Sequence, residues 1–176
     1  MNAIIIYKGR YGATRQYAEW LGEALQLPVA DPKDIPAEKL RNYDLVILGS
    51  SVYIGKLELY GWMKQNSHIL SGKKILLFIV CATPAHEVEK LREIESKNVP
   101  DSLKAVCTVF FLHGRMVMRQ LSWKDRLLLK MGARFEKDPE EKKHMLQDFD
   151  DVRKENLQAL LERTGKMLAA EKATAL

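Results

Sequence analysis

Short runs of consecutive apolar residues recur along the first two thirds of the chain. They lie at residues 3–7, 44–50, 74–82 and 105–114, with a weaker run at 28–31. Unbroken apolar runs of this length are typical of strands that are covered on both faces. Segments with helical spacing of apolar residues separate them, so the pattern predicts strands and helices in alternation.

Five strands that alternate with helices predict an α/β fold, in which a parallel sheet carries helices on both faces. For a chain of 176 residues, we expect a single domain, residues 1–176, with a flavodoxin-like three-layer sandwich and a five-stranded sheet of order 2-1-3-4-5. In such sheets a ligand binds at the carboxyl ends of the strands, where the connections diverge. Here that crevice lies above the first and third strands.

Two proline-containing stretches predict where later helices begin. Thr83 followed by Pro84 is typical of a helix start, and the helical pattern continues to about residue 97. The stretch "DPEE" at 138–141 combines an N-cap Asp, a first-turn proline and a Glu. We expect it to open one long helix that continues beyond Leu168.

The first crevice loop, "KGRYGAT" at 8–14, contains Gly9, Gly12, Thr14 and two cationic side chains. Backbone N–H groups at the helix start, the Thr14 hydroxyl and the helix dipole can together bind a terminal phosphate. The spacings of a Walker loop and of a dinucleotide fingerprint are both absent. The loop therefore fits either a mononucleotide phosphate or a tight turn that needs glycine only for its geometry.

The second crevice loop, "SSVYIGK" at 50–56, places small hydroxyl residues before Tyr53. A flat aromatic ligand could stack on the Tyr53 ring, with backbone donors around it. Alternatively, Tyr53 packs on the helix that follows. The loop at 81–85 borders the same crevice and would face the ligand from the other side.

Composition indicates a cytoplasmic protein. Cys81 and Cys107 both lie in apolar runs and form no CxxC pair, as expected of reduced strand residues. No apolar run is long enough to span a membrane, and the N-terminal stretch lacks the charged-then-apolar build of a signal peptide.

Positive charge is concentrated in one segment. Residues 113–137 contain seven basic and two acidic residues and so carry a charge equal to the net +5 of the whole chain. Within a basic insert at about 115–137, "SWKD" at 122–125 fits a capping box, and Gly132 could end the resulting helix. Trp123 and neighbouring leucines would share one face beside Lys124, Arg126 and Lys130. This pattern fits a sheet-edge cover, or a surface for anionic lipid or for an acidic, apolar substrate that is separate from the crevice.

Several kinds of site are excluded or unsupported. A phosphorylated receiver domain needs acidic residues after the first strand, where this chain has Lys8 and Arg10. The four histidines are scattered, and only His113 ends a strand near the crevice, where a lone histidine is usually structural. We therefore assign no catalytic side chain and expect no metal.

The stretches "YKGRYGATRQYAEWL" and "DLVILGSSVYIGK" resemble flavodoxin-domain proteins, and the menaquinone-dependent (oxygen-independent) protoporphyrinogen oxidase type most closely. The likeness extends into "RQLSWKDRLLLKMGARFEKD". It implies an FMN-binding oxidoreductase of haem biosynthesis in which the flavin supplies the chemistry. Porphyrinogen and quinone would be its small-molecule partners, and nucleic acid would not be one. The likeness also implies possible peripheral contact with the inner face of the cell membrane. The alternative is a flavodoxin electron carrier. Such carriers are typically acidic, whereas this chain has a pI of about 9.1.

The resemblance also implies which residues contact FMN. Phosphate contacts fall on Gly9, Arg10, Tyr11, Gly12, Ala13 and Thr14. Contacts to the flavin ring fall on Ser51, Val52, Tyr53, Ile54 and Gly55, with Ala82 and Thr83 on the other side. The family usually has Ser or Thr where this chain has Lys8 and Gly9, so one hydroxyl donor is missing. The substrate or membrane surface falls on Trp123, Lys124, Arg126 and Lys130.

Overall fold

The computed structural model describes residues 1–135 and 137–174. The strands are β1 (Ala3–Lys8), β2 (Val29–Ala30), β3 (Leu45–Tyr53), β4 (Lys56–Leu57), β5 (Lys74–Cys81), β6 (Cys107–His113), β7 (Arg115–Met116) and β8 (Phe149–Asp150). The α-helices are α1 (Ala13–Leu25), α2 (Ala37–Leu40), α3 (Tyr60–Gln65), α4 (Ser67–Leu70), α5 (Val88–Asn98), α6 (Trp123–Phe135), α7 (Pro139–Leu146) and α8 (Gln158–Thr174).

The central sheet has the strand order β2-β1-β3-β5-β6, and all of these strands are parallel. This confirms the predicted flavodoxin-like α/β fold and the order of its five principal strands. The prediction of exactly five strands was wrong, because β4 adds a sixth strand to the described sheet by pairing antiparallel with β3.

The strand β4 exists because the chain reverses at Ile54 and Gly55. Both residues have positive φ, 48° and 72°, which is the conformation that a two-residue hairpin turn of type I′ requires. The predicted loop at 50–56 is therefore mostly strand, and only Ile54 and Gly55 form the turn. A β-branched residue such as Ile54 rarely takes up this backbone conformation, which is why the sequence did not suggest a hairpin.

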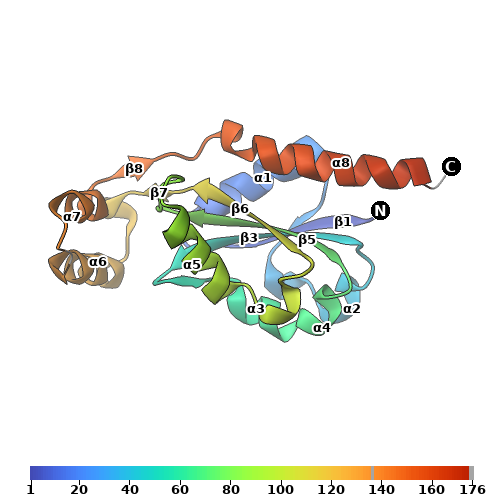
Figure 1. Cartoon of the computed structure of the whole chain (residues 1–176), viewed down its shortest axis with the longest axis horizontal. Coiled ribbons are helices and arrows are strands. Elements are labelled where there is room, and N and C mark those ends of the chain that lie inside the picture. Colours follow the sequence, from blue (N-terminus) through green and yellow to red (C-terminus); the bar gives the residue numbers. More distant parts are fainter. Residues whose placement is uncertain (136, 175–176) are drawn as a thin grey trace.

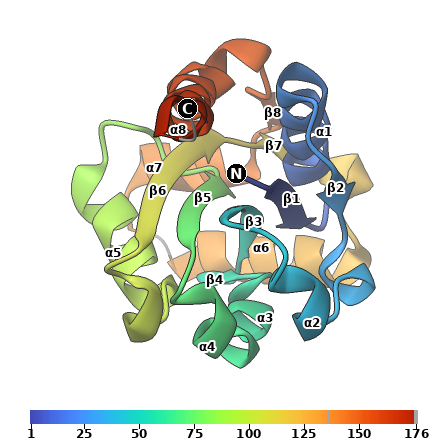
Figure 2. The same cartoon turned by 90° about the vertical axis from the view of Figure 1, so that its right-hand side faces the viewer.

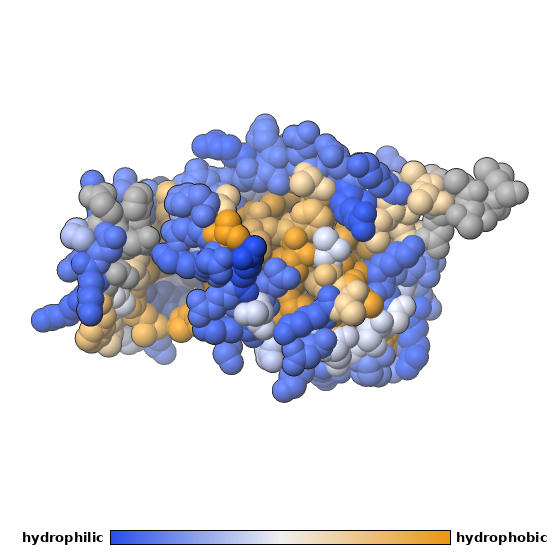
Figure 3. All heavy atoms as spheres, viewed as in Figure 1, coloured by the Kyte–Doolittle hydropathy of each residue, from blue (hydrophilic) through white to orange (hydrophobic). Residues whose placement is uncertain are grey.

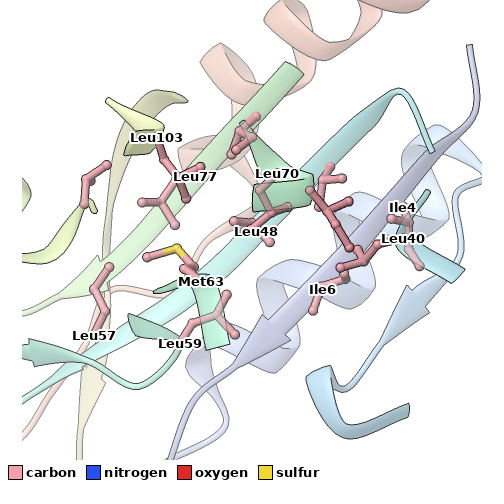
Figure 4. Close-up of a cluster of buried hydrophobic side chains, with 14 of the residues drawn as sticks. Ile4, Ile6, Leu40, Leu48, Leu57, Leu59, Met63, Leu70, Leu77 and Leu103 are labelled. Atoms are coloured by element: carbon pink, nitrogen blue, oxygen red, sulfur yellow. The ribbon is translucent and has the colours of Figure 1, made fainter. Parts of the chain in front are cut away.

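Successive residues of the parallel strands pack on opposite faces of the sheet, where two separate cores form. Figure 2 shows α1 and α8 on one face and the short helices α2, α3 and α4, with α5, on the other. Ile4 and Ile6 of β1 belong to the core beneath α2–α5, whereas Ile5 and Phe78 belong to the core beneath α1 and α8. Figure 4 shows the first of these cores, in which strand side chains meet Met63 of α3. Burial on both faces explains the unbroken apolar runs.

One predicted helix start and one predicted helix length were wrong, whereas the helix start expected at 138–141 was confirmed, because α7 begins at Pro139. Helix α5 begins at Val88 instead of Thr83, because the Glu87 N–H donates to the Pro84 carbonyl at 3.0 Å and closes a separate turn first. The helix from "DPEE" ends as α7 at Leu146, and α8 begins only at Gln158. Between them lie β8, which pairs antiparallel with β7, and a short 3₁₀ helix at Lys154–Leu157. Local helical spacing does not reveal the β7–β8 pairing.

The end predicted for α6 was also wrong, because this helix continues through Gly132 to Phe135. Ser122 caps it as expected, since its Oγ accepts a hydrogen bond from the Asp125 N–H at 3.1 Å. The glycine has a different role, because a Cβ at position 132 would lie only 3.3 Å from Met145 Cε of α7. Gly132 thus lets α7 pack closely against α6.

Helices α6 and α7 form a hairpin beyond the carboxyl ends of the sheet strands, at the left-hand end of Figure 1. The chain leaves the sheet at Gly114 and returns at Asp151, and the Asp151 N–H donates to the Gly114 carbonyl at 3.1 Å. The short β7–β8 ladder forms a neck that begins at this point. The excursion is therefore longer than the predicted insert at 115–137. Within the described residues, no helix has both the length and the apolar character needed to cross a bilayer.

Candidate functional site

A cavity of about 420 Å³ lies between the carboxyl ends of β1, β3 and β5 and the α6–α7 hairpin. Its volume falls in the range of small-molecule and cofactor sites. The predicted site residues that line it are Arg10, Tyr11, Ala13, Thr14, Ser51, Val52, Tyr53, Ile54 and Ala82. The predicted residues Gly9, Gly12, Gly55 and Thr83 do not line this cavity.

The first turn of α1 faces this cavity with its backbone donors uncapped. Gly12 is the N-cap residue, has a φ of 85° and makes no side-chain capping hydrogen bond, and the first turn contains no acidic residue. The first N–H groups of a helix have no partner within the helix. Together with the helix dipole, they make this end of α1 suitable for an anion.

Two hydroxyl groups lie beside this helix start. Thr14 is almost fully buried, and Ser51 Oγ is buried without a hydrogen-bond partner in the described part of the chain. The backbone of Gly9 lies close to both hydroxyl groups, because a Cβ at position 9 would lie 2.5 Å from Thr14 Oγ1 and 3.5 Å from Ser51 Oγ. A buried hydroxyl without a partner is costly unless something binds it. The loop therefore fits a phosphate group, and Gly9 supplies the space that the loop needs.

A polar cluster closes the rim of the cavity next to the phosphate-type loop. Tyr53 donates a hydrogen bond to Asp125 Oδ1 at 2.6 Å, and Tyr11 donates to the other carboxylate oxygen. The Arg10 guanidinium lies 3.7 Å from the centre of the Tyr53 ring and pairs with Glu58 at 3.1 Å. One face of Tyr53 is thus in contact with a cation, and its hydroxyl is held by the α6 helix.

These contacts change the proton affinities of the cluster. The hydroxyl of Tyr11, and after it that of Tyr53, lowers the pKa of Asp125, so the carboxylate is charged at neutral pH. The same hydrogen bond to Asp125 is the main cause of a raised pKa for Tyr53. Cys81 also lines the cavity, but burial raises the pKa of its thiol, which leaves it poorly nucleophilic.

The basic helix α6 borders the cavity, although the four residues predicted to form a separate surface do not line it, so that surface stays a prediction. Asp125, Leu128 and Leu129 of α6 line the cavity directly. The cationic side chains of the same helix, Lys124, Arg126 and Lys130, are exposed and do not line it, and neither does Trp123. One helix therefore presents an acidic and apolar side to the cavity and a basic side to solvent.

Sequence reasoning missed the part of the cavity wall that the excursion supplies. The missed side chains are Arg115 and Met116 of β7, Leu121 before α6, Met145 of α7 and Phe149 of β8. No local motif marks them, because it is the β7–β8 pairing that returns the chain to the cavity. His113, the one histidine expected nearby, does not line the cavity, and its backbone carbonyl accepts a hydrogen bond from Tyr17 at 2.8 Å. Among the described residues, no group of His, Cys, Asp and Glu side chains is arranged to hold a metal ion.

The family comparison agrees with this geometry. The model of a family described as "Flavodoxin domain" matches residues 4–143, which include β1, the first crevice loop, β3 and most of the excursion. No match was found among curated proteins.

Solved structures show more distant likeness. The Trp repressor binding protein from Bacillus subtilis is 12% identical, with 64% of this chain and 85% of that chain covered and a TM-score of 0.46. A flavodoxin from the domain Archaea is 20% identical, with 73% and 90% covered and a TM-score of 0.41. Megasphaera elsdenii flavodoxin is 18% identical, with 62% and 82% covered and a TM-score of 0.44. These identities and scores are too low to add to the family model.

Proposed function

Because the chain belongs to the flavodoxin domain family, we propose that it binds FMN in the cavity at the carboxyl ends of its strands and works as an FMN-dependent oxidoreductase. The observation that carries the proposal is the uncapped start of α1, with the buried and unpartnered Ser51 hydroxyl beside it. This arrangement provides donors for one terminal phosphate. The sequence has no dinucleotide fingerprint, which favours a mononucleotide over FAD or NAD.

The residues of this chain would position the cofactor and exclude water from it. The N–H groups at the start of α1, the Thr14 hydroxyl and the Ser51 hydroxyl would hold the phosphate. Val52, Ala82 and apolar side chains of the excursion would surround the ring. Bound FMN supplies the transfer of hydrogen equivalents, and the protein supplies the dry pocket in which this transfer occurs.

We propose further that the enzyme is a quinone-dependent protoporphyrinogen oxidase, which acts in haem biosynthesis. The resemblance of the crevice loops and of the α6 segment to that type supports this reaction. The cavity wall supports it as well, because it combines mainly apolar side chains with Arg10 and Arg115, which pair with Glu58 and Asp150. An apolar macrocycle with propionate groups requires this combination of apolar surface and cations.

Titration of the apoprotein with FMN tests the cofactor. Flavin fluorescence should be quenched with an end point at one equivalent. FAD and NADH, which have a second nucleotide that this single phosphate loop does not serve, should bind much more weakly. An absence of quenching at micromolar protein would refute the proposed cofactor.

An anaerobic assay separates the enzyme from an electron carrier. Protoporphyrinogen and a menaquinone analogue are supplied together, and porphyrin fluorescence is followed with and without the quinone. Porphyrin formation that requires both protein and quinone supports the oxidase. No turnover, combined with rapid flavin reduction by a flavodoxin reductase, supports the carrier.

We propose that the outer side of α6 contacts an anionic membrane surface. Trp123, Leu127, Met131 and Phe135 are each about half or more exposed, although they are large and apolar. Figure 3 shows apolar side chains at the surface of the hairpin end, among charged ones. Lys124, Arg126, Lys130 and Arg134 lie on the same helix. A short helix of this kind lies in the interface of a bilayer and does not cross it.

Charge reversal of Lys124, Arg126 and Lys130 to Glu should abolish sedimentation with anionic vesicles. Each cation near such a surface contributes about 1 kcal/mol, so three account for most of a modest, salt-sensitive attachment. Reversal of Lys39, Arg41 and Lys64, which are exposed around α2 and α3, is the matched control and should leave sedimentation intact. The membrane proposal fails if the wild-type protein does not sediment with anionic vesicles at low salt, or if both triple variants sediment with them to the same extent.

A further inference from the structure

Helix α6 buries its single acidic side chain although the rest of the helix is strongly basic. Asp125 is 9% exposed, whereas the neighbouring residues Lys124 and Arg126 are exposed. A buried carboxylate costs free energy unless hydrogen bonds or opposite charges compensate. Its compensation comes from outside the helix, from the hydroxyl groups of Tyr11 and Tyr53.

Helix capping does not explain the position of this carboxylate. In a complete capping box the side chain at this position accepts a hydrogen bond from the backbone N–H of the cap residue. Here the Ser122 N–H donates to the Tyr11 hydroxyl at 3.4 Å, and the Ser122 side chain caps the helix alone. The Asp125 carboxylate is left to bind the two tyrosines.

The two tyrosines come from different walls of the cavity. Tyr11 lies in the loop before α1, beside the proposed phosphate site, and Tyr53 ends β3, beside the proposed ring site. All three residues line the cavity. Among the residues that the structure describes, Arg10 supplies the cation of this cluster. Its NH1 lies 3.9 Å from the Asp125 carboxylate, while its NH2 makes the closer pair with Glu58. The charge of Asp125 is therefore only partly balanced by Arg10.

From this geometry we infer that Asp125 is a positioning residue of the proposed flavin site, which holds Tyr11 and Tyr53 in place and makes the bound flavin harder to reduce. The inference rests on the proposed binding of FMN. When FMN takes up two electrons and one proton, its charge becomes one unit more negative. A fixed anion in a cavity wall of low dielectric opposes that change. The two hydroxyl groups fix where the anion lies.

Replacement of Asp125 by Asn tests the inference, because the amide keeps the size and an acceptor oxygen but removes the charge. The reduction potential of bound FMN is measured by anaerobic titration against a reference dye. We expect the equilibrium constant for two-electron reduction to rise about tenfold, which corresponds to a potential about 30 mV more positive. Glu58→Gln is the matched control, because it removes one negative charge next to Arg10 without lining the cavity. It should shift the potential much less.

A second measurement follows the tyrosines without flavin. In the apoprotein, phenolate absorbance at alkaline pH reports the pKa of Tyr53, which the hydrogen bond to Asp125 raises. In Asp125→Asn this pKa should fall, and Tyr53→Phe identifies the signal. A Tyr53 titration that is unchanged in Asp125→Asn overturns the positioning role.

The outcomes separate this inference from the proposed function. If wild-type protein binds no FMN, the proposed function fails and the inference fails with it. If wild-type protein and Asp125→Asn both bind FMN with the same potential, only the inference is overturned. The same conclusion follows if Glu58→Gln shifts the potential as much as Asp125→Asn, because the effect would then not be specific to the cavity wall.

Discussion

Replacement of Gly9 by Ala should lower the affinity for FMN on the order of 100-fold. The added Cβ would lie 2.5 Å from Thr14 Oγ1 and 2.6 Å from Thr14 Cβ, so the loop and the first turn of α1 must move apart. That movement displaces several phosphate donors together. Hydrogen bonds to a charged group contribute about 1.5–3 kcal/mol each, and a loss of about 3 kcal/mol corresponds to roughly 100-fold in affinity.

Two variants show whether the loss of affinity has this cause. Thr14→Ala removes one hydroxyl donor and should cost about 1.5 kcal/mol, the lower end of that range, or roughly tenfold in affinity. Gly61→Ala adds the same methyl group as Gly9→Ala, but at a position on α3 with nothing within 4 Å, and should bind FMN like the wild type. Fluorescence titration measures all three. Wild-type affinity in Gly9→Ala would show that the loop is not a phosphate site.

Replacement of Gly49 by Ala should destabilise the fold by about 3 kcal/mol, at the upper end of what overpacking in a core costs. Gly49 on β3 pairs with Phe78 on β5, and a Cβ at position 49 would lie 2.1 Å from the Phe78 ring. The ring is fully buried and has no free space to enter. Urea unfolding of the apoprotein measures the change in free energy.

A second substitution at Phe78 isolates this contact. Phe78→Leu alone should destabilise the protein, because a smaller side chain leaves part of the ring volume empty. In the double variant Gly49→Ala with Phe78→Leu, the methyl group occupies some of that volume. The loss of stability should therefore be smaller than the sum of the two single losses, by at least about 0.5 kcal/mol. Strict additivity would mean that the ring does not cause the need for glycine at position 49.

The sheet could be predicted from the sequence because its information is local. Strands buried on both faces leave unbroken apolar runs, such as "AIIIY" at 3–7. These runs predict a buried strand independently of how distant parts of the chain fold. The loop that begins α1 could be predicted for the same reason, since its glycines and Thr14 adjoin a strand and a helix. By contrast, the hairpin at Ile54 depends on a backbone conformation that its side chain disfavours, so the turn gave no signal.

The excursion could not be predicted in the same way. Its course depends on Phe149 and Asp150 pairing with residues more than 30 positions earlier, and helical spacing in "DPEE" and beyond carries no information about that pairing. Asp125 is the clearest example. Its capping spacing suggested a purely local role, whereas its carboxylate binds Tyr11 and Tyr53, which lie 114 and 72 positions away.

The neck formed by β7 and β8 has a consequence for how such proteins diversify. Because the chain departs at Gly114 and comes back at Asp151, which are joined by a hydrogen bond, the connectivity of the sheet is the same with or without the intervening residues. The segment between Gly114 and Asp151 can therefore be lengthened, shortened or exchanged without changing the order of the sheet strands. A chain with a plain turn at this point would keep the sheet and the helix start at Gly12. It would lack the second wall of the cavity, which α6, α7 and the β7–β8 ladder supply.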